Sequence, residues 1–155
     1  MATTIVPSNL IVTITESYSL NGVDYGNTMN KTYSSNGKVS QRVMSVSGKS
    51  GESTVWTEIL ALSSRDGQGQ VVEADYKYFR VTNLDSANTL YLKIYNGVDY
   101  VAFEVAPSSS LMLMDSGYDA TLTTAIVSLS DIELISGQSS HDTEAIDVEF
   151  LMVTT

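Results

Sequence analysis

The chain alternates from end to end between short runs of β-forming residues and clusters of turn-forming residues. Val, Ile, Thr and Tyr fill the runs, whereas the helical spacing of apolar residues is hard to find. Turn clusters at 34–37, 48–51 and 66–69 separate the runs. This pattern predicts strands at 9–20, 23–33, 38–46, 53–62, 76–84, 89–95, 98–106, 110–115, 121–128, 132–136 and 143–153. We also expect one helical turn at 128–133.

Many short strands at this spacing are typical of a β-sandwich or a barrel. The length of 155 residues suits one domain, and a chain of this size buries roughly 70% of its unfolded surface. We predict a single all-β domain over 1–155, an antiparallel β-sandwich of jelly-roll type. The strand order does not follow from the pattern.

The best-defined hairpin surrounds Asn96 and Gly97. An Asn-Gly pair favours a two-residue type I′ turn, which would place Lys93 opposite Tyr100. The two faces of this hairpin separate into an apolar set and a set rich in tyrosine. With the alternating C-terminal strand, the apolar set predicts these core residues: Leu90, Leu92, Val101, Phe103, Val148 and Phe150.

The pentapeptide Asn-Gly-Val-Asp-Tyr occurs twice, at 21–25 and at 96–100. One interpretation is a duplicated half-domain, and the other is two independent hairpins that use the same favoured turn. The flanking residues do not match, which favours the second interpretation. In the first copy the turn would pair Leu20 with Val23 and Tyr18 with Tyr25.

The charge balance is strongly acidic, with a formal net charge of −10 and a pI of about 4.2. Such a surface repels phosphate, so we expect no direct nucleic-acid binding and no docking on anionic lipid. The first residues have no basic region followed by a long apolar run, and no apolar stretch is long enough to span a bilayer. We expect a protein made in the cytoplasm of its producer, without a membrane partner.

The residue types needed for common active sites are scarce. Because the chain has one histidine, His141, and no cysteine, we expect neither a zinc site nor a Ser-His-acid triad. There is no G-x-S-x-G sequence and no phosphate-binding glycine loop. Calcium needs only oxygen ligands, so Asp66, Asp115 and Asp119 keep that possibility open. We predict no enzyme activity, no catalytic residue, no metal and no cofactor.

Aromatic residues are the most suggestive feature of the surface. The chain has nine tyrosines and Trp56, and several alternate so that they share one face of a strand or hairpin. Aromatic faces anchor protein interfaces, stack on sugar rings, or line the edge of a core. We predict an interface formed by Tyr76, Tyr78, Arg80, Tyr91, Lys93, Tyr95 and Tyr100.

The segment 78–88, Tyr-Phe-Arg-Val-Thr-Asn-Leu-Asp-Ser-Ala-Asn, resembles a segment of virion structural proteins from tailed phages of marine and cyanobacterial hosts. In that pattern the segment is followed by a strand such as 90–95, a returning strand such as 101–105, a turn containing Pro107 and a strand such as 111–115. The stretches 129–135 and 145–150 are similar to the family's closing strands. The resemblance covers roughly the second half of the chain.

This resemblance implies a phage virion structural protein, first of all a capsid decoration or cement protein that binds and stabilises the assembled particle. A neck or tail adaptor or another tail component is the alternative. A carbohydrate-binding module for host attachment is a further alternative. The implied partners are major capsid or neck and tail proteins and further copies of this chain, in a homo-oligomer such as a trimer. The implied location is the virion.

Overall fold

The computed structural model describes residues 8–36, 38–49, 56–62, 76–97, 100–114 and 132–154. These residues form strands and no helix, and they contain no segment that is both helical and apolar over the length needed to cross a membrane. The strands are β1 (Ser8–Glu16), β2 (Ser19–Leu20), β3 (Val23–Asp24), β4 (Asn27–Asn36), β5 (Lys38–Val46), β6 (Thr57–Ala61), β7 (Tyr76–Asn83), β8 (Leu90–Tyr95), β9 (Tyr100–Val105), β10 (Ser110–Met114), β11 (Leu134–Ser139) and β12 (Ile146–Thr154).

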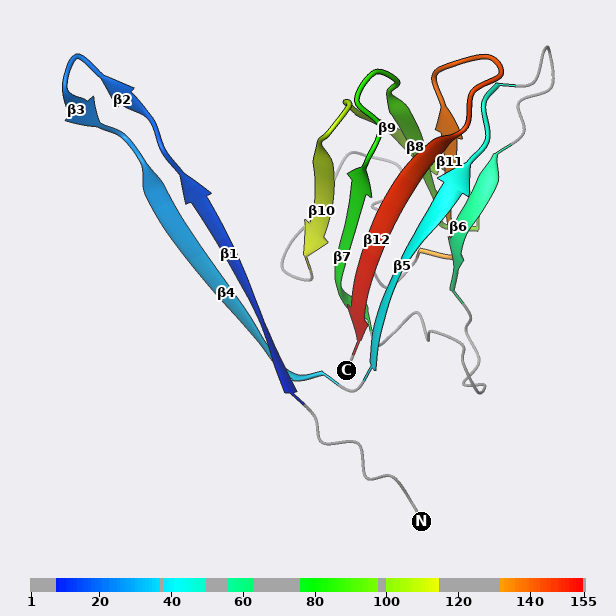
Figure 1. Cartoon of the computed structure of the whole chain (residues 1–155). Helices are drawn as coiled ribbons and strands as arrows, with labels where there is room; N and C mark the ends of the chain where they lie inside the picture. The colour runs from blue at the N-terminus through cyan, green and yellow to red at the C-terminus, as the bar shows by residue number, and fades with distance from the viewer. Residues whose placement is uncertain are drawn as a thin grey trace, which may run out of the picture.

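Strands β5 to β12 form two four-stranded antiparallel sheets that pack face to face (Figure 1). One sheet has the order β10-β7-β12-β5 and the other the order β6-β11-β8-β9. The pairs nest along the chain, because β5 pairs with β12, β6 with β11, β7 with β10 and β8 with β9. Such a nested set, rolled into two sheets, is a jelly roll, so the predicted fold class is confirmed.

The core lies between the inner faces of these two sheets. Leu90, Leu92, Val148 and Phe150 are fully buried there, as the alternation predicts. Phe150 packs against Phe79, with ring centroids 6.3 Å apart. Strand β12 lies between β7 and β5, which explains why its apolar pattern continues almost to the C-terminus.

The β8–β9 hairpin departs from the predicted register by two residues. Tyr95 pairs with Tyr100, so the connection spans 96–99, and only Gly97 of the Asn-Gly pair has a positive φ, +88°. This wider loop brings Val105 opposite Leu90, where both are buried. A shift of two residues keeps each side chain on its predicted face, because the side-chain period of a strand is two.

Two of the predicted core residues therefore lie nearer the surface than expected. Phe103 is half-buried and packs against the edge of the core. Val101 is 38% exposed, so its assignment to the core was wrong. The reason is its position on β9, the outermost strand of its sheet, beside the hairpin loop.

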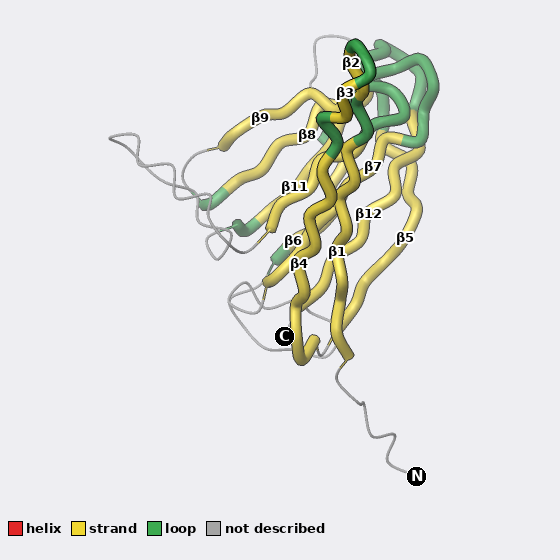
Figure 2. The backbone as a smooth tube through the Cα atoms, turned by 90° about the vertical axis from the view of Figure 1, so that its left-hand side faces the viewer, coloured by secondary structure: helices red, strands yellow, loops and turns green. Residues whose placement is uncertain are grey.

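Residues 8–36 form a two-stranded ribbon outside the jelly roll, which we call the arm (Figure 1, Figure 2). Strand β1 pairs with β4, and β2 pairs with β3 at the tip. There Asn21 and Gly22 both have positive φ, which gives the predicted two-residue turn with Leu20 opposite Val23. The two copies of the pentapeptide thus lie in different parts of the fold, as expected for two independent hairpins.

The base of the arm packs on the outer face of the β10-β7-β12-β5 sheet. Tyr33 of the arm is buried there with Tyr78 and Val153, and Leu10 and Val12 pack against the same cluster. Beyond this base the ribbon diverges from the sheet (Figure 1). The expected strand at 121–128, most of the expected helical turn, and Asp66, Asp115 and Asp119 lie outside the described residues.

Candidate interaction surfaces

The outer face of the β8–β9 hairpin brings together four of the predicted interface residues. Tyr91, Lys93 and Tyr95 alternate along β8, and Tyr100 lies opposite Tyr95. The Lys93 ammonium group lies 4.3 Å from the centroid of the Tyr100 ring, a favourable cation–π geometry. Tyr100 is 65% exposed, so this aromatic face reaches solvent.

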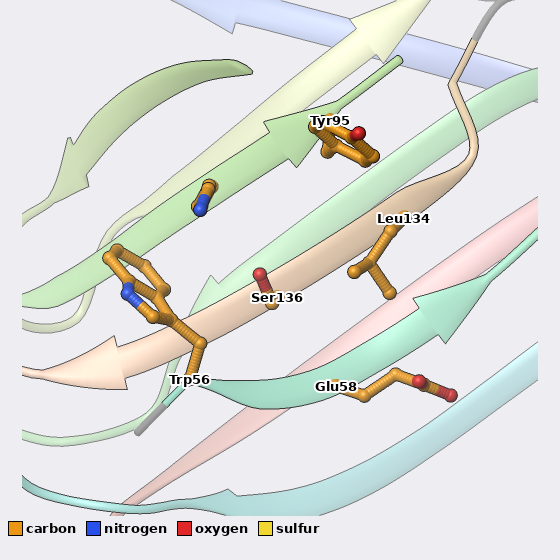
Figure 3. A pocket seen from close by; sticks show the side chains of 6 residues that line it. Trp56, Glu58, Tyr95, Leu134 and Ser136 are labelled. Atoms are coloured by element: carbon orange, nitrogen blue, oxygen red, sulfur yellow. The ribbon is translucent and has the colours of Figure 1, made fainter. Parts of the chain in front are cut away.

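Beside this face, residues of β6, β8 and β11 with Trp56 surround a hollow of about 330 Å³ (Figure 3). The rings of Trp56 and Tyr95 lie at its two ends, with Ser136 and Leu134 between them. The Lys93 ammonium also lies 5.5 Å from the Trp56 ring centroid, so it stands over two aromatic rings at once. Trp56 was not among the predicted interface residues. Its nearness to β8 depends on the order of the strands in the sheet, which the sequence pattern does not give.

The predicted face of β7 is covered by the chain itself, which corrects the assignment of Tyr78. Its side chain is only 3% exposed, and its ring centroid lies 6.2 Å from that of Tyr33 in the arm. Burial raises the pKa of Tyr78, and the nearby Arg80 charge opposes this only in part. Alternation identified a shared face correctly but could not show that the arm folds over it.

Arg80 is also engaged within the chain. Its Nη2 atom donates to Glu149 Oε2 at 2.8 Å, and both side chains are partly buried. Gln41 Nε2 donates to the second oxygen of the same carboxylate. Tyr76 begins β7, but its side chain lies outside the described part.

A second exposed surface follows the arm and the neighbouring strand β5. Among the described residues, eleven large hydrophobic side chains are strongly exposed, and eight of them lie between residues 11 and 43. They are Ile11, Tyr18, Leu20, Val23, Tyr25, Met29, Val39 and Val43. This concentration marks the arm and β5 as the main exposed apolar surface of the described structure.

The acidic residues are concentrated in the part of the chain that exposes few large hydrophobic side chains. Residues 1–49 contain four basic and two acidic residues, a net charge of +2, whereas residues 50–155 contain four basic and sixteen acidic residues, a net charge of −12. The apolar surface is thus attached to an acidic domain. This asymmetry is visible in the sequence, and it is the signal that could have identified the arm as a separate surface.

The loop around His141 has a structural role. The ring atom Nδ1 accepts the backbone N–H groups of Thr143 and Glu144, at 3.3 and 3.0 Å. The Ser139 hydroxyl oxygen accepts the backbone N–H of His141 at 3.1 Å. Within the described ranges, no group of three histidine or acidic side chains is placed to hold a metal ion.

Comparisons with protein-family models, with curated proteins and with solved structures give no match to this chain. The surfaces described above are therefore assigned from their own geometry and charge. The aromatic face of β8–β9 and the apolar surface of the arm and β5 are the two candidates for binding.

Proposed function

We propose that this chain is a structural protein of a tailed-phage particle, which acts by binding other proteins of that particle. The observation that carries the proposal is the exposed apolar surface of the arm and β5 on an otherwise acidic jelly roll. Exposed apolar surfaces of this extent mark contacts with other proteins. The acidic remainder keeps many copies soluble until they assemble.

The role that we favour is capsid decoration. A protein that binds the assembled shell, and not its free subunits, stabilises the shell by mass action. The resemblance of segment 78–88 to virion proteins of tailed phages supports a place in the particle but does not separate the shell from the neck or tail. A jelly roll serves many functions, so the fold does not make that choice either.

The proposal is tested on particles purified from the culture that produces the chain. Quantitative mass spectrometry should find the chain at a constant ratio to the major shell protein, and absence of the chain would contradict the proposal. A cryo-EM map of the same particles then separates the two roles. Jelly-roll density on the outer shell supports decoration, whereas density on the neck or tail axis supports an adaptor.

A second candidate function, glycan binding for host attachment, is favoured by the hollow between Trp56 and Tyr95. Aromatic rings stack on sugar rings, and Glu58 and Ser136 offer groups that bind hydroxyls. A glycan array probed with the wild type and with Trp56→Ala tests this site. Binding that survives Trp56→Ala, or loss of the same binding in the distant Tyr25→Ala control, would contradict it.

A further inference from the structure

We propose that the arm of one copy of this chain binds a second copy, where it lies against the arm and the outer face of β5. The inference rests on the proposed assembly function and names its first partner. It explains seven of the eight exposed hydrophobic side chains between residues 11 and 43, all except Ile11, whose pairing with Thr32 places it on the opposite face of the arm from Tyr33 and Met29.

The arm needs a partner because only its base is packed. A two-stranded ribbon alone is marginally stable in water and gains stability when a third strand or another surface covers it. Leu10 and Tyr33 lie opposite each other at the base, and both contact the sheet. Further out on the same face, Ile14 lies opposite Met29, and Met29 is 53% exposed.

The sheet offers a matching surface on the side where the arm stands. Val39 and Val43 of β5 are 63% and 59% exposed. They lie on the outer face, since Val39 pairs with Val153, which is buried under the base of the arm. The arm is fixed at that base and diverges from the sheet, so it does not cover β5 in its own chain (Figure 1). A second copy can cover both surfaces.

Charge favours a second copy that approaches by this surface. Two acidic remainders, each with a net charge of −12, repel each other, whereas residues 1–49 carry a net charge of +2. Only three charged residues occur in the arm itself: Glu16, Asp24 and Lys31. The arm is depleted in charge and contains three of the nine tyrosines, Tyr18, Tyr25 and Tyr33, and depletion of charge with enrichment of tyrosine is the composition of an interface centre.

The available area is also sufficient. Without Ile11, two tyrosines and five other apolar side chains, each about half exposed or more, offer roughly 450 Å² of apolar surface per copy. A standard interface buries about 800 Å² per partner, of which roughly 60% is apolar. The surface of the arm and β5 therefore matches the apolar part of one complete interface between two copies.

The first test is the mass of the full chain by sedimentation velocity at micromolar concentrations. We expect a dimer or a larger closed oligomer in the wild type. Leu20→Ser combined with Met29→Ser should weaken self-association by about tenfold or more. Leu84→Ser is the matched control, because Leu84 and Leu20 are both 48% exposed but Leu84 lies in the β7–β8 loop. Circular dichroism confirms that each variant is folded.

The second test uses the absence of cysteine from the chain. Met29→Cys and Val43→Cys are made as two separate proteins, one with a size tag, and are mixed under mild oxidation. If the arm of one copy lies on β5 of another, the two proteins should form a disulfide-linked heterodimer. Met29→Cys mixed with Leu84→Cys should link far more slowly. Equal rates for the two mixtures would overturn the proposed contact.

The outcomes also separate this inference from the proposed function. A monomeric wild type, or an oligomer that the arm variants do not weaken, overturns the contact between copies. If a monomeric chain is nevertheless found in particles, and the arm variants are lost from them, the arm binds a different particle protein and the assembly function stands. If the chain is absent from particles but self-associates through the arm, only the virion role fails.

Discussion

At the scale of single residues, the buried amide of Asn83 organises one corner of the jelly roll. Its Nδ2 atom donates to the backbone carbonyls of Asn88 and Val105, at 2.9 and 3.1 Å, and its Oδ1 atom accepts the Asp85 N–H. Asp85 Oδ1 in turn accepts the N–H groups of Asn88 and Ala87, and these bonds lower the pKa of Asp85. The segment 83–88 thus holds β7, β8 and the end of β9 together.

Asn83→Ala should lower the free energy of unfolding by about 2–3 kcal/mol, because it leaves buried carbonyls without donors. Urea unfolding measures the change. Asn88→Ala is the matched control, since its amide makes one exposed bond to Glu144 at 3.3 Å and should cost well under 1 kcal/mol. Equal losses in the two variants would show that the Asn83 amide has no special role.

The raised pKa of Tyr78 predicts a pH dependence of stability. The folded state holds the Tyr78 proton more tightly than the unfolded state does, because burial disfavours the phenolate. This contribution is complete below the unfolded tyrosine pKa of about 10 and is lost as pH rises through the folded value. Tyr78→Phe should therefore lose less stability than the wild type as the pH rises above about 10.

Urea unfolding at several alkaline pH values measures this difference. Tyr100→Phe, at a ring that is 65% exposed, controls for the general effect of alkali on the other tyrosines. If Tyr78→Phe and the wild type lose stability in parallel, the arm does not bury Tyr78 in solution.

At the scale of elements, the same pentapeptide joins strands in two different registers. In the arm tip no packed core constrains the ribbon, and Asn21-Gly22 forms the favoured two-residue turn. In the β8–β9 hairpin the core requires Val105 opposite Leu90, and the loop lengthens to 96–99. Turn preference thus decides the register only where packing does not compete with it.

Strand β11 lies so close to the core that a side chain at position 137 would press on its neighbours. A Cβ atom there would lie 2.9 Å from Ile59 Cδ1 and 3.1 Å from Leu90 Cδ1. Gly137→Ala should lower the free energy of unfolding by about 1–3 kcal/mol through overpacking. Ile59→Val removes the nearest methyl group, so the double variant should be more stable than the sum of the single changes predicts.

A double-mutant cycle by urea unfolding checks this coupling. Gly22→Ala is a useful contrast, because its Cβ would meet nothing within 4 Å and its φ of +78° predicts a backbone penalty of about 1 kcal/mol. Ile59→Val should not relieve that penalty. Additive behaviour of Gly137→Ala and Ile59→Val would contradict the close contact.

At the scale of the whole molecule, the net charge of −10 sets how stability responds to salt. Like charges repel in the compact state, and salt screens this repulsion as the Debye length falls from about 30 Å at 10 mM to about 8 Å at 150 mM. The thermal midpoint should therefore rise over this range of NaCl concentration at neutral pH, and rise much less near the pI of about 4.2.

Circular dichroism melting curves at fixed protein concentration measure the midpoint. A midpoint that falls with NaCl at neutral pH would mean that favourable ion pairs, such as Arg80 with Glu149, outweigh the general repulsion. The Leu20→Ser and Met29→Ser double variant, compared at the same concentration, separates the effect of salt on folding from its effect on self-association.

The sequence by itself determined the features that depend on near neighbours. Strand positions, the sandwich class and the inward faces of β8 and β12 follow from alternation, since successive strand residues point to opposite sides. The absence of cysteine and the acidic balance are equally direct.

Only the tertiary structure decided which surfaces are covered and how strands are ordered. Tyr78 shares a face with Arg80, as predicted, but the arm buries it from a distance of more than forty residues along the chain. The nested order from β5 to β12, the two-residue shift at β9 and the projecting arm likewise depend on contacts between distant segments. Local alternation specifies that two faces differ, and packing between distant segments determines which of the two meets water.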